Sequence, residues 1–187
     1  YFQATAEQNA TPAASITNSP SISTTASTTA GVIIVNYDLS DPDSSGITPA
    51  DTSATTTLMY DIGITLSSAI SSTTETNATS TGTNASIIAA NDVIQVDNEL
   101  MLVSANNSNI LTVIRGYRGT TATTHSNGAT IWLTANTVIG NVGNSVSLGT
   151  GKSISWTPAS DKTATSSAAR LMVTAIDGRI VNQVGTG

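Results

Sequence analysis

The sequence predicts an all-β protein: a small antiparallel β-barrel or sandwich with an extended N-terminal arm and additional C-terminal strands. Short runs of β-branched and apolar residues alternate with clusters of turn residues, and no helical period is sustained over a dozen positions. Charged residues make up 10% of the 187 residues and aromatic residues 4%, which is typical of all-β surface proteins rich in Ser and Thr. We divide the chain into an arm at 1–30, a central β domain at 31–134 and a C-terminal β extension at 135–187.

The arm at 1–30 is dense in Ser, Thr, Ala and Pro and poor in large apolar residues. Such a segment cannot form a core alone. It is either a disordered terminus or an arm that becomes ordered along a neighbouring subunit, where its backbone hydrogen bonds would end. The chain begins with Tyr1 rather than Met, which suggests processing, truncation or a preceding segment. Its first three residues are either native sequence or the remainder of an engineered protease site.

The first strand is predicted at 31–39, in the sequence GVIIVNYDL. The turn residues at 40–51 follow it. Asp41 and Asp43 imitate the opening of a calcium-binding loop, in which alternate oxygen ligands face one cation. Thr52 stands where a bidentate Glu would complete the ligands, so an Asx-rich turn is favoured over a calcium site.

Further strands follow along the chain. A strand at 57–67 is expected to break at Gly63, and 67–86 is expected to be a polar surface loop. A β-meander is predicted over 92–114, with its apolar alternation at Val93, Ile94, Val96, Leu100, Leu102, Ile110, Thr112 and Ile114. Later strands are expected at 128–134, 145–149, 153–157 and 169–176. Trp132 and Trp156 are expected to be core or interface anchors.

The stretch RGYRGTTATTHSNGATI at 115–131 contains Arg115 and the single histidine, His125. Gly116 and Gly119 allow a sharp chain reversal at the end of a strand, and Gly128 begins the returning strand. Glu99 lies in the same meander, so Arg115 or His125 could pair with it across strands. We therefore predict a buried, hydrogen-bonded polar cluster that holds a corner of the fold.

Other functions are disfavoured by what the sequence lacks. One histidine without a nucleophile motif is a poor catalytic centre, and zinc would need at least two further ligands. We therefore expect no enzymatic activity, no cofactor and no metal. A net charge of −6 and a pI near 4.3 disfavour direct nucleic-acid binding. No apolar run approaches the length of a membrane-spanning helix, and without cysteine there is no disulfide or thiolate site.

The segment 92–133 resembles a module of tailed-bacteriophage virion structural proteins, which carries the motif R-G-x-x-G-T-x-x-x-x-H-x-x-G-A. The residues that match the module are Ile94, Glu99, Met101, Val103, Val113, Arg115, Gly116, Gly119, Thr120, His125, Gly128, Ala129 and Ile131. The segment at 55–70 is similar to the strand that opens the same module. About half of the chain is covered, and neither the arm nor the last fifty or so residues are included.

The resemblance implies a non-enzymatic virion structural protein. With its long arm, the chain best suits a capsid cement or decoration subunit on the particle surface, forming a homo-oligomer and binding the major capsid protein or other virion proteins. A tail, baseplate or fibre component is an alternative, although fibres usually show sequence repeats and none is found. A secreted filament or surface glycoprotein subunit is a second alternative. It is suited by N-x-S/T sequons, all expected to lie in loops or in the arm, at Asn9, Asn77, Asn84 and Asn106.

Overall fold

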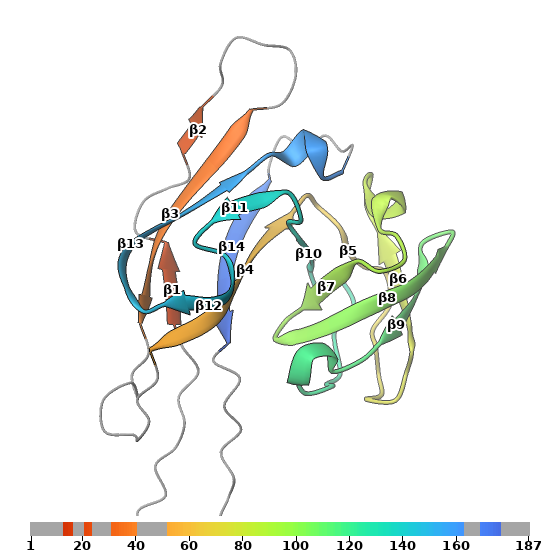
Figure 1. The fold of residues 1–187 in the computed structure, drawn as a ribbon. Helices are drawn as coiled ribbons and strands as arrows, with labels where there is room; N and C mark the ends of the chain where they lie inside the picture. Colours follow the sequence, from red (N-terminus) through yellow and green to blue (C-terminus); the bar gives the residue numbers. More distant parts are fainter. Residues whose placement is uncertain (1–12, 17–20, 24–30, 41–51, 163–168, 177–187) are drawn as a thin grey trace, which may run out of the picture.

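The computed structural model describes residues 13–16, 21–23, 31–40, 52–162 and 169–176. Within these ranges the regular elements are β-strands and three short 3-10 helices. The strands form two antiparallel sheets, one of five strands and one of nine (Figure 1). The all-β prediction is therefore confirmed. No helix in the described ranges is long and apolar enough to cross a membrane.

The five-stranded sheet is built around β3, whose buried residues Val35, Tyr37 and Leu39 alternate with more exposed ones as a strand requires. One edge of β3 pairs with β13, and β13 pairs with β11. The other edge pairs with β1 and β2. The strands are β1 (Ala13–Ile16), β2 (Ser21–Ser23), β3 (Val32–Ser40), β11 (Val138–Gly140) and β13 (Gly149–Trp156).

Strands β1 and β2 lie in the predicted arm, and their pairing differs from the prediction. These two arm segments end their backbone hydrogen bonds on β3 of their own chain, whereas the sequence pointed to a neighbouring subunit. An unpaired strand edge readily binds a short extended segment. The two arm strands bind the edge of β3 in the same chain, and no second subunit is needed for this pairing. The other residues of the arm lie outside the described ranges.

The nine-stranded sheet is centred on β4. Along one edge β4 pairs with β14, and along the other edge with β12 at one end and β10 at the other. From β10 the sheet continues through β7, β8, β9, β6 and β5. The strands are β4 (Ser53–Asp61), β5 (Thr65–Leu66), β6 (Asn77–Thr81), β7 (Val93–Val96), β8 (Glu99–Asn107), β9 (Ile110–Ile114), β10 (Ile131–Thr134), β12 (Gly143–Ser147) and β14 (Arg170–Ile176).

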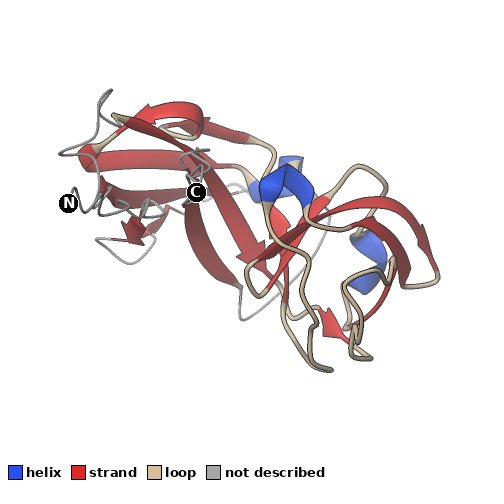
Figure 2. Ribbon diagram, turned by 90° about the horizontal axis from the view of Figure 1, so that it is seen from below, coloured by secondary structure: helices blue, strands red, loops and turns tan. Residues whose placement is uncertain are grey.

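The strands group into two lobes that lie side by side in Figures 1 and 2. The corner lobe is residues 62–134, with the 3-10 helices η1 (Ala85–Ile87) and η2 (Tyr117–Gly119). The frame lobe is β3, β4 and β11 to β14, with η3 (Pro158–Ser160). The predicted domain boundary after residue 134 falls at the end of β10. Of the strands beyond it, β13 pairs with β3, and β12 and β14 pair with β4.

In the frame lobe the five-stranded sheet packs over the β12–β4–β14 part of the larger sheet. Tyr37 of β3 donates a hydrogen bond to the carbonyl of Asn141 at 2.6 Å. The ring of Tyr60 in β4 lies 4.7 Å from that of Trp156 in β13, centroid to centroid. The strand order is open, so the sandwich-like form of the prediction is the one present.

The prediction of a polar loop at 67–86 holds for most of 67–76, which is exposed and outside the named strands, but it was wrong for the rest. This segment contains β6 and η1, and it buries Ile70, Ala78 and Ser80. Its Ser and Thr residues hid the strand, because the side chains on its buried face are small and give little hydrophobic contrast. The other predicted strands are present, and the break at Gly63 separates β4 from β5.

The apolar alternation assigned to the meander holds in β7, where Ile94 and Val96 are buried, but its phase was wrong in β9 and at Leu102 of β8. Met101 and Val103 of β8 and Leu111 and Val113 of β9 are buried, whereas Ile114 is 54% exposed. Residues 100–103 of β8 and four of the five residues of β9 are apolar, so alternation could not reveal the inward face. A register shift between Val103 and the paired residues beyond it also interrupts the regular period.

Candidate functional site

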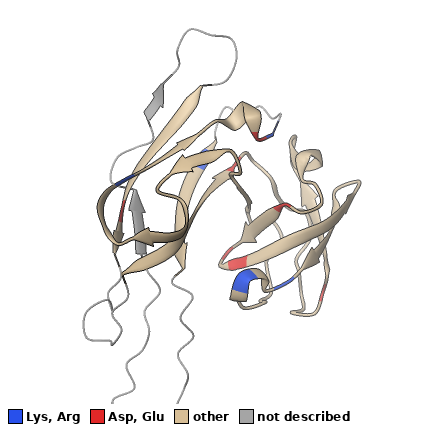
Figure 3. Cartoon of the chain, viewed as in Figure 1, with Lys and Arg blue, Asp and Glu red and all other residues tan. Residues whose placement is uncertain are grey.

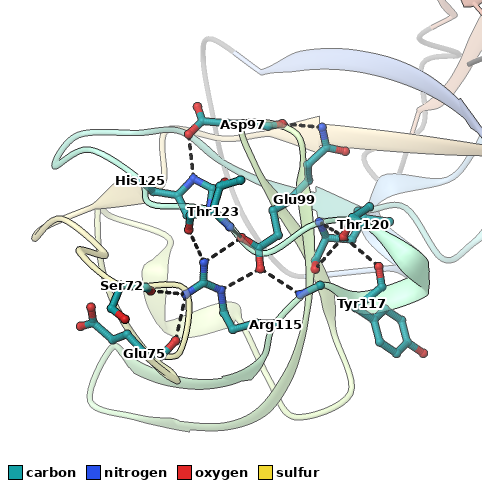
Figure 4. Close-up of polar contacts among 12 residues, drawn as sticks. Ser72, Glu75, Asp97, Glu99, Arg115, Tyr117, Thr120, Thr123 and His125 are labelled. Atoms are coloured by element: carbon teal, nitrogen blue, oxygen red, sulfur yellow. Dashed lines mark hydrogen bonds and ion pairs between the residues drawn. The ribbon is translucent and has the colours of Figure 1, made fainter. Parts of the chain in front are cut away.

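Three predicted residues converge from separate elements of the corner lobe. Glu99 is the first residue of β8, and Arg115 directly follows β9. His125 lies in the irregular segment between η2 and β10, and its backbone bridges that of Ile70. The β7–β8 turn, the end of β9 and this segment therefore meet at one end of the lobe (Figure 4). We call Asp97, Glu99, Arg115, Thr123 and His125 the polar corner.

Glu99 is at the centre of the polar corner and is fully buried. Arg115 donates to both of its carboxylate oxygens, through Nε at 2.7 Å and a terminal guanidinium nitrogen at 2.7 Å. The backbone N–H groups of Gly116 and Thr123 donate to it at 2.9 and 3.0 Å. The Nε2 atom of His125 lies 2.9 Å from Oε2. The predicted pairing of Glu99 with Arg115 or His125 is therefore present with both residues.

Arg115 also donates hydrogen bonds to three backbone carbonyls in loops. Its guanidinium donates to the backbone oxygens of Ser72 at 3.2 Å, Glu75 at 2.9 Å and Thr123. Ser72 and Glu75 belong to the segment before β6 and lie 43 and 40 residues before Arg115 in the sequence. A planar guanidinium with five N–H donors suits such a junction. Arg115 thus joins the β5–β6 connection to the β8–β9 meander.

His125 bridges two carboxylates. Its Nδ1 atom lies 2.7 Å from Asp97 and its Nε2 atom faces Glu99. The histidine side chain is fully buried, whereas that of Asp97 is 60% exposed. Ionised carboxylates only accept hydrogen bonds, so each ring nitrogen of His125 faces a hydrogen-bond acceptor. Both ring nitrogens are occupied by these contacts, and neither faces a Ser or Thr hydroxyl in the described part of the chain.

The surroundings of Glu99 stabilise its charged form. Burial alone would raise the pKa of Glu99. The hydrogen bonds from Arg115, the Thr123 N–H, His125 and the Gly116 N–H outweigh burial and lower the pKa to about 2. The carboxylate is therefore ionised at neutral pH and acts as the acceptor that organises the corner.

The three glycines of the motif occupy backbone conformations that favour glycine. The φ angles of Gly116, Gly119 and Gly128 are 61°, 83° and 82°. A Cβ on Gly116 would lie 2.8 Å from the carbonyl oxygen of Thr120, whereas one on Gly119 or Gly128 would have no close contact within 4 Å among the described residues beyond its chain neighbours. The predicted chain reversal after β9 is confirmed, and Gly116 is its most constrained position.

Asp97, Ser72 and Glu75 were missed by the sequence reasoning. Asp97 had been interpreted as a turn residue, and it is one, with a φ of 50°. An acidic residue two positions before Glu99 lies on the same face of a hairpin end, and that spacing was the available signal. The Ser72 and Glu75 contacts use backbone carbonyls, which carry no signal in the sequence.

The remaining candidates lie outside the polar corner. Trp156 is buried, and Trp132 is half-buried with the Arg170 guanidinium 5.3 Å above its ring. Asp41 and Asp43 of the calcium-like turn lie outside the described ranges. In the described part of the chain, no group of three or more acidic, His or Cys side chains is placed to hold a metal ion.

The sequons differ from the expectation that all lie in loops or in the arm. Asn77 is exposed but lies in β6, and Asn106 lies in β8. The Asn106 amide donates to the carbonyl of Ile88 at 2.7 Å, and the buried Asn84 amide donates to that of Ile62 at 3.2 Å. Asn9 lies outside the described ranges. A sugar on Asn84 or Asn106 would break these contacts.

Comparisons with protein-family models, with curated proteins and with solved structures find no match for this chain.

Proposed function

We propose that this chain is a non-enzymatic structural subunit of a tailed-phage virion, and specifically a cement or decoration subunit that binds neighbouring capsid proteins. The polar corner carries the proposal. Its motif residues point inward and use their hydrogen-bonding groups on one another. Catalytic groups must instead face a substrate with free donors or acceptors. The polar corner is thus suited to stabilising the fold, and it supports a structural role for the chain.

Two further observations support this proposal. The amides of Asn84 and Asn106 are used inside the fold, which disfavours a glycoprotein modified at these sequons. The arm strands β1 and β2 lie along the edge of β3, and sheet edges commonly accept strands from other chains. In the described part of the chain β1 and β2 pair with β3, so the outer edges of these arm strands are the surface that a neighbouring subunit can pair with.

Deletion of residues 1–30 tests whether the arm holds the subunit on the capsid. We expect the shortened chain to fold with a nearly unchanged unfolding midpoint, because β3 keeps its pairing with β13. Added to particles that lack the native subunit, the shortened chain should occupy far fewer sites than the full chain does. In a lattice of many copies, the loss of a modest contact per copy is amplified. If the shortened chain instead binds the particles at full occupancy and resists dissociation as well as the native chain, the arm does not contribute to attachment. That result would favour a fibre or adhesin role.

The location on the particle provides an independent test. Antibodies against this chain should label the head surface of purified particles in a regular array, visible at low resolution by electron microscopy. Labelling confined to the tail or baseplate would contradict the decoration role while leaving a virion role in place. Absence of the chain from purified particles would contradict both.

A further inference from the structure

A groove lies between the two lobes, separate from the polar corner. The frame lobe contributes strand residues of β4, β12 and β14, and the corner lobe contributes Arg118 from η2. Its volume is about 460 Å³, which lies in the range of small-molecule sites. The lining residues are Thr55, Thr56, Thr57, Gly143, Asn144, Ile176 and Arg118.

Arg118 brings an uncompensated positive charge to this groove. Arg115, Lys162 and Arg170 each pair with a carboxylate. Arg118 makes no ion pair with the described part of the chain, and its contact there is with the Tyr117 ring, 5.6 Å from the guanidinium carbon to the ring centroid. An unpaired guanidinium in a polar groove of an acidic protein is suited to a carboxylate ligand, which it can bind through two parallel hydrogen bonds.

The backbone on both sides of the groove is held in unusual conformations. Arg118 has φ and ψ angles of 53° and 32°, which are uncommon for a residue other than Gly, Asn or Asp. Opposite it, β12 has a register shift between Gly143 and Val146, and Ser145 has a φ of 58°. Positive φ angles and β-bulges of this kind are enriched beside binding sites, where they aim particular side chains.

We propose that this groove binds an acidic sugar. Its carboxylate would lie on the Arg118 guanidinium, and its hydroxyls would exchange hydrogen bonds with Thr55, Thr57 and Asn144. Hydroxyl and amide groups can both donate and accept, as sugar hydroxyls require. Ile176 supplies an apolar surface for the face of the ring. The inference concerns a different surface from the arm and does not depend on the proposed virion role.

Titration of the full chain with three probes tests the ligand class. By NMR, D-glucuronate should produce saturable shifts, and D-glucose, which lacks the carboxylate, should bind at least about tenfold more weakly. Acetate, which lacks the ring, should be weaker by a similar factor. No saturable response to glucuronate would overturn the proposal. Acetate binding equal to that of glucuronate would also overturn it, because the site would then recognise a carboxylate alone.

Variants test the role of Arg118. Arg118→Gln should weaken glucuronate binding about tenfold or more, whereas Lys152→Gln, which removes a positive charge outside the groove lining, should leave it unchanged. Arg118→Gly should also lose binding, yet be at least as stable as the native chain, because glycine adopts a positive φ without strain. Unchanged binding in Arg118→Gln, or a clear loss of stability in Arg118→Gly, would assign Arg118 to packing and overturn the proposal.

Discussion

The two lobes differ in how many charged groups they gather around one buried carboxylate. The corner lobe buries an ionised Glu99 and surrounds it with an arginine, a histidine and two backbone donors. Apart from Asp61, which pairs with the more exposed Arg170, the frame lobe buries neutral groups, such as the Tyr37 hydroxyl on the Asn141 carbonyl and the Trp156 indole on Asp161. In Figure 3, charged positions lie close together at the β7–β8 turn and η2, and others are spread along the frame lobe.

The difference follows from the backbone of each lobe. In the frame lobe, long strands such as β4 and β14 satisfy each other through a regular ladder. In the corner lobe, the irregular segments before β6 and after η2 have few ladder partners, and side chains must satisfy their backbone groups. A charged cluster can serve many such groups at once, but it is intolerant of losing one member. The predictions below test this contrast.

The largest effect is expected from Glu99→Gln. The substitution leaves Arg115 and His125 buried without their shared anion, and breaking a buried pair in this way costs about 3–5 kcal/mol of unfolding free energy. Asp97→Asn is the matched control, because it contacts the same histidine from an exposed position and should cost on the order of 1 kcal/mol. Urea denaturation measures both. Equal losses would show that Glu99 does not organise the corner.

The pH dependence of stability should also depend on Glu99. Its pKa is lowered from 4.5 to about 2 in the folded chain. The folded state therefore favours the ionised form, and the stability gained is present above the ordinary pKa and lost as the pH falls toward about 2. Between about pH 5 and pH 2, the native chain should lose more stability than Glu99→Gln. Parallel pH profiles for the two proteins would contradict the lowered pKa.

Next in size are the two glycines after β9. Gly119→Val should cost about 1–3 kcal/mol through backbone strain at positive φ. Gly116→Val should cost more, because its Cβ would also meet the Thr120 carbonyl oxygen. The loss of unfolding free energy in Gly119→Val measures the backbone strain alone. The additional loss in Gly116→Val measures the steric clash. Near-neutral stability for both would show that the turn does not have this conformation.

The smallest effects are expected from two tyrosines of the frame lobe. Tyr37→Phe removes a buried neutral hydrogen bond and should cost about 1 kcal/mol. The Tyr60 hydroxyl is buried and has no hydrogen-bond partner in the described part of the chain, so Tyr60→Phe should be neutral or slightly stabilising. A loss for Tyr37→Phe comparable to that for Glu99→Gln would remove the contrast between the lobes.

The fold class was predictable because strand periods and turn residues are local properties. The strand at 31–39, the break at Gly63 and the meander at 92–114 all depend on near neighbours in the sequence. The β6 strand was missed, because Asn77 to Thr81 has no large apolar residue. The phase of β9 was wrong, because four of its five residues are apolar and both faces look alike.

The sequence by itself determined that the chain is all-β, that Gly116 and Gly119 form a reversal, and that Glu99 has Arg115 and His125 as partners within reach. These depend on residue type and short spacing. Only the tertiary structure decided that one carboxylate binds both partners, that Arg115 fastens the segment before β6, and that β1 and β2 lie on β3 of the same chain. Such contacts join segments distant in the sequence, often through backbone atoms that every residue shares, so they become specific only when the sheets bring those segments together.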